Sequence, residues 1–351
     1  MQLEEIIATI QPLDEATMQS ARVRQDTLTK PRGSLGRLEE LSIQLAGITG
    51  NPFPSMERKA VIVMAADHGV ALEGVSAYPA EVTPQMVLNF LRGGAAINVL
   101  ARQANARVVI VDMGVAADLT DPSRKLIHRK IGFGTANLAK GPAMTPEQAR
   151  QSIQSGIEIA EAEIAPGVDI LATGDMGIGN TTASAAIACA LMDQTPENMA
   201  GRGTGVDDDG LKRKIDVIGR ALDVNRPDGK DALDVLAKVG GFEIGGLVGV
   251  ILASAVNRKP VVIDGFISTA AAMLAVTLAP AARDYMIAAH VSQERGHRLM
   301  LEWLGLKPLL DLNLRLGEGT GAVLAVHLIE ASARILCEMA TFGEAGVSDK
   351  E

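Results

Sequence analysis

The stretch VDILATGDMGIGNTTASAAIACAL, residues 168–191, decides the fold of this chain. Its first residues, 168–172, form a short apolar run with the branching expected of a buried β-strand. Residues 173–180 then carry three glycines, and the small side chains of residues 181–191 predict a buried helix. Three residues at the start of that helix are good N-caps: Asn180, Thr181 and Thr182. The stretch therefore predicts a strand, a glycine loop and a helix in direct succession.

This strand–loop–helix unit predicts an anion site. A glycine loop that leads into a helix exposes backbone N–H groups beside the positive end of the helix dipole. A tight turn that binds nothing is the alternative. The small side chains around the loop and the presence of Asp175 in it favour a phosphate site. The loop lacks the adjacent acidic pair that suits magnesium pyrophosphate, so we expect a phosphate monoester without an obligatory metal.

Further apolar runs alternate with helical patterns along the chain, which predicts βαβ units and a parallel sheet. The predicted strands are residues 60–66, 107–114, 168–172, 260–265 and 285–291. The predicted helices that alternate with them include residues 83–91, 95–103 and 146–163. The fold class is therefore α/β.

Polar residues follow the carboxyl end of each predicted strand. Each of them alone is explained as a loop cap, but ligands of open parallel sheets bind at this edge. Because the same coincidence recurs at five strands, we expect the functional site there. The residues are Asp67, His68, Asp112, Asp175, Asp264, His290 and Ser292.

The composition describes a globular chain with a large core. Of 351 residues, 47% are hydrophobic and only 3% aromatic, so the core is built from Ala, Val, Ile, Leu and Met. We expect an α/β domain of residues 51–321. Helical patterns near both termini have no strands beside them, which predicts a small helical domain from residues 1–50 and 322–351.

Charge and apolar patterning exclude several classes of partner. The net charge is −9 and no basic block is present, which argues against nucleic acid. Cys189 and Cys337 lie in apolar helical patterns and are expected to be buried hydrophobes in a reducing compartment. The N-terminus lacks a basic region, and the longest apolar segment, residues 244–256, is too short to cross a bilayer. We expect a cytoplasmic protein without a membrane partner.

Glu318 is the sharpest candidate for chemistry. Glycines on both sides allow close approach of a ligand and leave the carboxylate unshielded. A helix that begins near Thr320 lowers the pKa of this carboxyl, whereas burial raises it, and a carboxylate between these effects can act as a general base. The alternative is a solvent-exposed glutamate in a helix-entry turn.

Two other features have weaker signals. His68 has no second histidine at metal-ligand spacing, so we expect a hydrogen-bonded scaffold residue and no zinc site. Residues 201–209 form a second glycine loop, which leads into a helix that carries Lys214. Lys214 could neutralise an anion, or the loop is simply an acidic helix start. The chain has no P-loop, no GxGxxG after its first strand, no GxSxG and no CxxC.

Seven motifs together resemble one enzyme family, the nicotinate-nucleotide:dimethylbenzimidazole phosphoribosyltransferases. The resemblance covers essentially the whole chain, and the order of so many motifs makes it specific. The motifs are KPRGSLGRLEELS (30–42), AADHGVALEGVSAYPAEVTPQMVLNFLRGGAAI (65–97), GDMGIGNTTASAA (174–186), KVGGFEIGGLVG (238–249), IDGFISTAAA (263–272), HVSQERG (290–296) and LRLGEGTGA (314–322).

The resemblance implies a reaction. Nicotinate mononucleotide gives its ribosyl phosphate to 5,6-dimethylbenzimidazole, which forms α-ribazole 5′-phosphate and nicotinate with inversion at C1′. It also implies a Rossmann-like parallel sheet flanked by helices, a small domain from both termini, a homodimer, and no cofactor. Two rival functions stay open: a magnesium-dependent transferase that uses phosphoribosyl pyrophosphate, and a non-catalytic nucleotide sensor.

The resemblance further implies roles for single residues. Glu318 matches the catalytic glutamate, and Asp175 lies where the family usually has Glu, near the reacting ribose. The phosphate and nucleotide would be bound by Gly177, Ile178, Gly179, Asn180, Thr181, Gly203, Lys214, Asp264 and Ser292. The base pocket would be formed by Tyr78, Gln85, Met86, Phe90 and Leu316.

Overall fold

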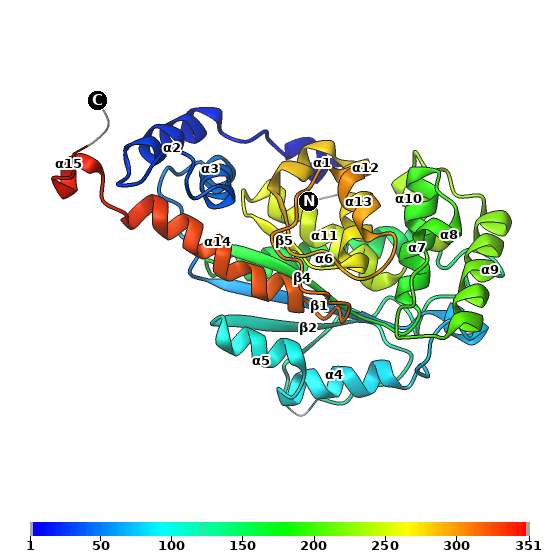
Figure 1. The fold of residues 1–351 in the computed structure, drawn as a ribbon. Helices are drawn as coiled ribbons and strands as arrows, with labels where there is room; N and C mark the ends of the chain where they lie inside the picture. The colour runs from blue at the N-terminus through cyan, green and yellow to red at the C-terminus, as the bar shows by residue number, and fades with distance from the viewer. Residues whose placement is uncertain (1–2, 122, 349–351) are drawn as a thin grey trace.

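The computed structural model of the chain describes residues 3–121 and 123–348 and centres on a six-stranded parallel sheet (Figure 1). The strand order is β3-β2-β1-β4-β5-β6, the order of a doubly wound Rossmann-type sheet. In this order the direction of winding reverses between β1 and β4, and the reversal leaves a crevice at their carboxyl ends. The strands are β1 (Lys59–Ala66), β2 (Ala106–Gly114), β3 (Leu126–His128), β4 (Ile170–Met176), β5 (Val261–Ile263) and β6 (Met286–Ala288).

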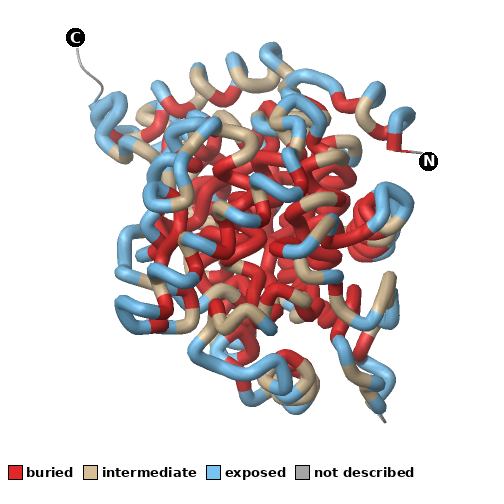
Figure 2. Tube along the Cα trace, turned by 90° about the vertical axis from the view of Figure 1, so that its right-hand side faces the viewer, coloured by how far each residue is buried: buried red, intermediate tan, exposed pale blue. Residues whose placement is uncertain are grey.

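Side chains of β1 alternate between two cores, one on each face of the sheet. Ile62 and Met64 pack with α6 (Pro146–Ile164), α11 (Phe242–Val256) and α12 (Phe266–Leu278). Val61 and Val63 pack into the opposite core, with α3 (Arg37–Thr49), α4 (Val82–Arg92), α5 (Ala96–Gln103) and α14 (Thr320–Glu338). Figure 2 shows the result, a buried centre enclosed by exposed helices and loops.

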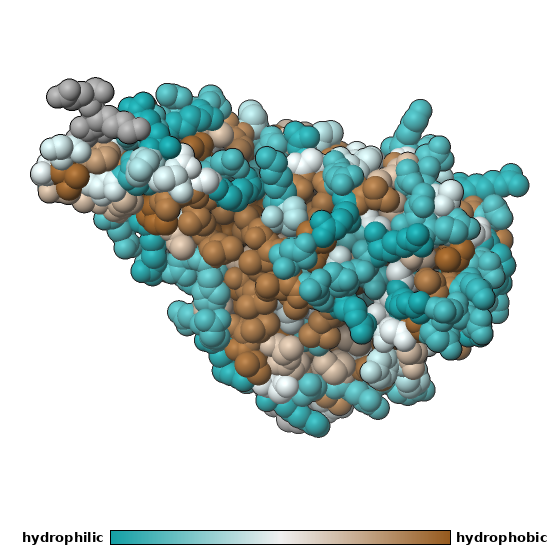
Figure 3. Space-filling view, in the orientation of Figure 1, coloured by the Kyte–Doolittle hydropathy of each residue, from teal (hydrophilic) through white to brown (hydrophobic). Residues whose placement is uncertain are grey.

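The remaining helices complete these two layers. α7 (Asn180–Met192) follows β4 and contacts α12 and α9 (Asp208–Asn225). Figure 3 shows apolar side chains gathered in a band that continues from the region of α14 toward α4 and α5. The other helices are α1 (Leu3–Thr9), α2 (Glu15–Thr27), α8 (Pro196–Met199), α10 (Ala232–Val239), α13 (His297–Leu304), α15 (Phe342–Ala345), η1 (Gly69–Glu73) and η2 (Pro280–Tyr285).

The five predicted strands are confirmed, but two details of the central stretch were wrong. β4 continues through Asp175 to Met176, because its pairing with β1 extends through Met64 and Ala65. Asp175 is therefore a strand residue and not part of the loop. The N-cap of α7 is Gly179, whose φ of 102° no predicted cap residue adopts readily. β3 was not predicted, since three residues at the sheet edge carry little periodic signal.

Segments from the two termini lie side by side. α2 and α3 pack on each other and on α14, and Leu41 and Leu45 of α3 share the core that contains Val61 of β1. The division into two domains stays a prediction, and residues 1–2 and 349–351 lie outside the described part of the chain. α14 is long and apolar enough to cross a membrane, but 56% of its apolar window is buried inside the protein, so it is a core helix.

A close helix contact, between α6 and α11, generates a stability prediction. A methyl group at Gly156 would clash with the carbonyl oxygen of Gly246. Gly156→Ala should therefore lower the free energy of unfolding by about 1–3 kcal/mol, measured by urea denaturation. The control is Gly219→Ala in α9, where nothing lies within 4 Å of the added methyl. That substitution should stabilise the protein by about 1 kcal/mol through helix propensity. Equal effects at both positions would contradict the prediction.

Candidate active site

A cavity of about 660 Å³ opens at the carboxyl edge of the sheet. It is lined by the residues that follow β4, β5 and β6, by α4, and by the segment that precedes α14. The structure brings eleven predicted site residues together around it: Tyr78, Met86, Asp175, Gly177, Ile178, Asn180, Thr181, Gly203, Ser292, Leu316 and Glu318. Five others do not line it: Gln85, Phe90, Gly179, Lys214 and Asp264.

Glu318 occupies an unusual backbone turn. Gly317, Glu318 and Gly319 all have positive φ, at 85°, 63° and 89°. A left-handed conformation at a residue with a side chain costs on the order of 1–3 kcal/mol and is typical of functional sites. The backbone N–H of Glu318 donates to the carbonyl oxygen of Asp175 (3.2 Å). The turn is thereby attached to the end of β4.

The carboxylate of Glu318 points to the start of α5. Its Oε2 accepts the backbone N–H of Ile97 at 3.3 Å, and Ile97 is the second residue of that helix. We expected α14 to stabilise this charge, but the hydrogen bond comes from α5. Burial raises the pKa of the Glu318 carboxyl, the Ile97 N–H opposes the shift, and the Asp264 charge adds to it. Glu318 is therefore a buried carboxyl with a raised proton affinity.

Asp175 lines the same cavity. Its Oδ2 accepts a hydrogen bond from Asn180 Nδ2 (3.0 Å), while its Oδ1 is buried and has no partner among the described residues. Burial raises the pKa of Asp175 well above its ordinary value, and the charges of Asp264 and Glu243 raise it further. A protonated Asp175 can donate a hydrogen bond to a ligand oxygen.

The glycine loop after β4 has the expected position, but two of the backbone N–H groups that were expected to bind phosphate are bonded within the protein. The Ile178 N–H donates to Thr83 Oγ1 (3.1 Å), and the Asn180 N–H donates to the Gly177 carbonyl (3.2 Å). A phosphate bound by these two amides must share or replace those bonds. His68 is a scaffold residue, as predicted: behind the loop, its Nε2 lies 2.6 Å from Oε1 of the equally buried Glu243.

Lys214 connects the helix start after the first glycine loop with the second glycine loop, residues 201–209. Its side chain is fully buried, and Nζ donates to Thr181 Oγ1 (2.8 Å) and to the Gly201 carbonyl (3.2 Å). Burial lowers its pKa to about 8, an effect that the nearby Glu294 charge opposes. Lys214 therefore contacts Thr181 of the cavity wall and the second glycine loop, but it does not line the cavity itself.

Sequence reasoning missed Glu294 and Arg315 of the cavity wall, and also Thr83, which does not line the cavity. Glu294 accepts the Gly203 N–H (2.9 Å), and Thr83 accepts the Ile178 N–H, as described above. Arg315 donates to the Gly203 carbonyl (3.2 Å) and is the one Arg or Lys among the residues that line the cavity. These residues lie within the quoted family motifs, but their contacts depend on loops distant in sequence.

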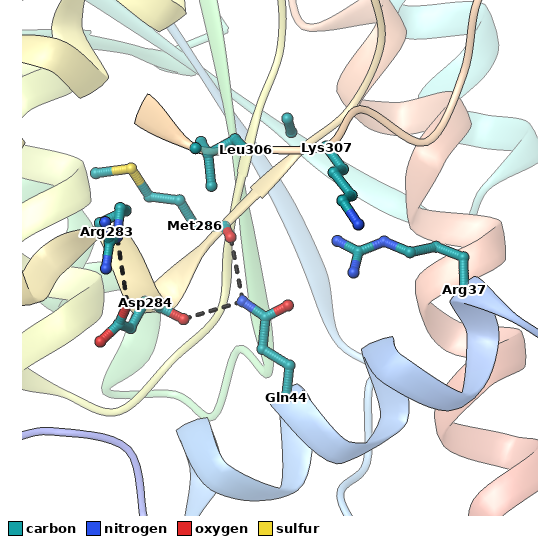
Figure 4. A pocket seen from close by; sticks show the side chains of 9 residues that line it. Arg37, Gln44, Arg283, Asp284, Met286, Leu306 and Lys307 are labelled. Carbon is teal, nitrogen blue, oxygen red and sulfur yellow. Dashed lines mark hydrogen bonds and ion pairs between the residues drawn. The ribbon is translucent and has the colours of Figure 1, made fainter. Parts of the chain in front are cut away.

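A second cavity, of about 420 Å³, lies beside β6 and α3 and contains none of the predicted site residues. Figure 4 shows Lys307 and Arg37 pointing toward each other there. Gln44 Nε2 donates to the carbonyl oxygens of Asp284 (3.0 Å) and Met286 (3.3 Å), which anchors α3 to β6. Within residues 3–121 and 123–348, no group of three or more His, Cys, Asp or Glu residues could hold a metal ion.

The raised pKa of Glu318 generates a prediction about stability. The folded state binds the proton more tightly than the unfolded state, whose ordinary value is 4.5. The wild-type protein should thus lose stability as the pH rises through the folded-state pKa. Glu318→Gln keeps an acceptor for the Ile97 N–H and does not titrate. The free energy of unfolding of this variant should exceed that of the wild type by on the order of 1 kcal/mol at pH 8 and by less at pH 4, measured by denaturant unfolding. A gain confined to acidic pH would contradict this.

Comparison with known proteins agrees with this geometry. Residues 10–347 match a protein-family model described as a phosphoribosyltransferase. The chain is 64% identical to the nicotinate-nucleotide–dimethylbenzimidazole phosphoribosyltransferase of Roseiflexus sp. (strain RS-1), over 99% of this chain and 98% of that protein. It is 62% identical to the protein of the same name from Chloroflexus aggregans, over 99% of both chains.

A solved structure supports the same assignment. The crystal structure of this phosphoribosyltransferase from Thermus thermophilus matches with a TM-score of 0.91 at 52% identity, over 96% of this chain and 100% of that chain. The family model and the relatives extend over nearly the whole chain, and so does the parallel α/β architecture. The chain therefore belongs to the nicotinate-nucleotide–dimethylbenzimidazole phosphoribosyltransferase family, a family of pentosyltransferases.

Proposed function

We propose that this enzyme transfers phosphoribosyl from nicotinate mononucleotide to 5,6-dimethylbenzimidazole, with inversion at C1′ and with Glu318 as the general base. The products are α-ribazole 5′-phosphate and nicotinate. One observation carries the proposal. The carboxylate of Glu318, whose pKa is raised by burial, lines the same cavity as the glycine loop at the start of α7. The names of the similar enzymes support the choice of substrates.

A single base is sufficient for this reaction. The pyridine of nicotinate mononucleotide is bonded to C1′ as a cation, so it leaves as a neutral ring and needs no general acid. The attacking nitrogen of dimethylbenzimidazole becomes cationic unless the N–H proton of the ring is removed. Glu318 accepts that proton, and the electron pair of the C1′–N bond departs with nicotinate. The raised pKa of Glu318 makes it a stronger base than an ordinary glutamate.

The walls of the cavity suit two flat rings on opposite sides of a ribose. Tyr78, Met86 and Leu316 give one part of the wall an apolar surface for the benzimidazole. Because the β-nucleotide yields an α-product, the incoming ring attacks the face opposite the departing ring. Fixing both rings in line with C1′ supplies much of the rate enhancement.

Polar groups of the cavity wall suit the ribosyl phosphate. Thr181 lies in the first turn of α7, where the helix dipole favours an anion. Arg315 supplies a positive charge next to Gly203, and Ser292 adds a hydroxyl. Burial raises the pKa of Asp175 and so favours its protonated form, which would donate to a ribose oxygen. Gln85 and Phe90 have no part in this arrangement, since Gln85 is exposed outside the cavity and Phe90 is buried in the core.

Two further expectations accompany the proposal. The predicted homodimer has support from the apolar band in Figure 3, since extended apolar surface is typical of interaction sites. The cytoplasmic location also stays a prediction.

The central test is Glu318→Gln, assayed by nicotinate release and by the anomer of the product. The wild type should form the α-nucleotide in the presence of a metal chelator. The variant should bind nicotinate mononucleotide with nearly unchanged affinity but turn over more slowly by a factor of roughly 100 or more. Near-normal turnover would reject Glu318 as the base. A wild type that needs magnesium and phosphoribosyl pyrophosphate, or that binds nucleotide without turnover, would favour one of the rival functions.

The acidic limb of the pH profile gives an independent prediction. Glu318 works as a base only when deprotonated, and its pKa is raised above 4.5. The rate kcat should therefore fall as the pH drops through that raised pKa, with a midpoint above 4.5. The residual rate of Glu318→Gln should lack this limb. Persistence of the same limb in the variant would assign it to another group.

A further inference from the structure

We propose that Asp264 is a positioning residue for Glu318, because its carboxylate holds the turn that presents the base to the substrate. This inference rests on the proposed function, since it assigns Asp264 a task in the same reaction. It differs from the predicted role of Asp264 in nucleotide binding, because Asp264 does not line the cavity.

Asp264 is fixed at the end of β5 and reaches the start of α14. Its side chain is fully buried. One carboxylate oxygen, Oδ2, accepts the N–H of Gly319 (3.2 Å), and the other, Oδ1, accepts the N–H of Ala322 (2.8 Å). Its own N–H donates to Thr173 Oγ1 (3.1 Å), so the residue is anchored to β4 as well. Both oxygens are therefore engaged by the segment that follows Glu318.

The turn requires such an external partner. The N-cap of α14 is Gly319, which gives the left-handed φ that the turn needs but has no side chain to cap the helix. The first N–H groups of a helix have no partners within it, and a carboxylate is the acceptor that a helix N-terminus favours. Asp264 supplies this cap from a neighbouring strand. The left-handed glycine, Gly319, and the capping carboxylate, Asp264, thus come from two different segments of the chain.

Asp264 acts on the reaction through Glu318 and not through the ligand. Of its neighbours, His290 lines the cavity, and its Nε2 lies 3.9 Å from Asp264 Oδ1. The Gly319 amide that Asp264 holds is adjacent to Glu318, whose own N–H is bonded to Asp175. The turn is therefore held on both sides of the base, by β4 on one and by Asp264 on the other.

The substitution Asp264→Asn tests this role. The amide oxygen can accept one N–H, but its NH₂ group then faces the second N–H donor, so the turn shifts. Since a displacement of about 1 Å can cost roughly 100-fold in rate, we expect kcat to fall by about 30- to 100-fold. Binding of nicotinate mononucleotide, measured by calorimetry, should change by less than about threefold, because Asp264 does not touch the nucleotide.

A double-mutant cycle separates positioning from general damage. If Asp264 acts through Glu318, the loss in kcat should nearly vanish in the Glu318→Gln background, to less than about threefold. Hydrogen exchange provides a second readout, which holds even if residual turnover is immeasurable. The amides of Gly319 and Ala322 should exchange faster in the folded Asp264→Asn protein. Should that variant not fold, Asp264→Ser, whose hydroxyl accepts one N–H, takes its place.

The matched control is Asp231→Asn. Asp231 is also a capping carboxylate, and its Oδ1 accepts the N–H groups of Leu233 (3.0 Å) and Asp234 (3.1 Å) at the start of α10, but it does not touch the Glu318 turn. It should leave kcat of the folded protein and the exchange of Gly319 nearly unchanged. The inference would be overturned if Asp264→Asn lowered kcat by the same factor in the wild-type and in the Glu318→Gln background. It would also be overturned if Asp264→Asn left kcat unchanged, or if nucleotide affinity fell in step with kcat. A wild type without nicotinate release overturns the proposed function instead, and this role of Asp264 with it.

Discussion

The site depends on one close contact, in which the turn that contains Glu318 lies against the last residues of β4. The Glu318 N–H donates to the Asp175 carbonyl, and a side chain at Gly174 would meet the Glu318 carbonyl oxygen at 2.5 Å. This contact places a carboxylate from the C-terminal part of the chain beside the glycine loop that begins one residue after β4. Without it, Glu318 and the glycine loop would not share a cavity.

The same contact gathers acidic side chains in a region with little solvent. Asp175, Asp264 and Glu318 are all buried, and burial raises the pKa of each of them. The desolvation of these carboxyl groups and the left-handed backbone of Glu318 oppose folding locally. Large apolar cores on both faces of the sheet offset this cost. The arrangement is typical of active sites, where stability is lower than the fold alone would allow.

Much of the fold was predictable because it depends on local patterns. Continuous apolar runs with polar residues at their ends identified five of the six strands and the edge that carries the site. The strand β4 extends beyond its predicted end because pairing with β1 overrides the local signal of Gly174 and Asp175. The predicted cap of α7 failed for a related reason, since the φ of the N-cap suits glycine better than a side-chain cap.

The site was predictable in its residues but less so in their tasks. The flanking glycines indicated Glu318, which lines the cavity, and the lack of a second histidine at ligand spacing indicated a hydrogen-bonded His68, which contacts Glu243. The burial of Lys214 behind Thr181 and the engagement of Asp264 with α14 involve segments separated by 33 and 55 residues, the latter counted to Gly319. Hydrophobic periodicity in the sequence does not predict contacts between such distant segments. Side chains that support a site therefore resemble side chains that contact its ligand until the loops are placed.

The two outermost strands have a consequence for the behaviour of the protein in concentrated solution. β3 and β6 are only three residues long, and the free side of β6 is occupied where Leu309 and Leu310 donate to Ala288 and Ala289. A long, flat edge would offer unpaired backbone groups to a strand of another molecule. Short edge strands, one of them partly covered, limit sheet-to-sheet growth, so this enzyme can carry a strongly apolar parallel sheet without a ready template for fibrils.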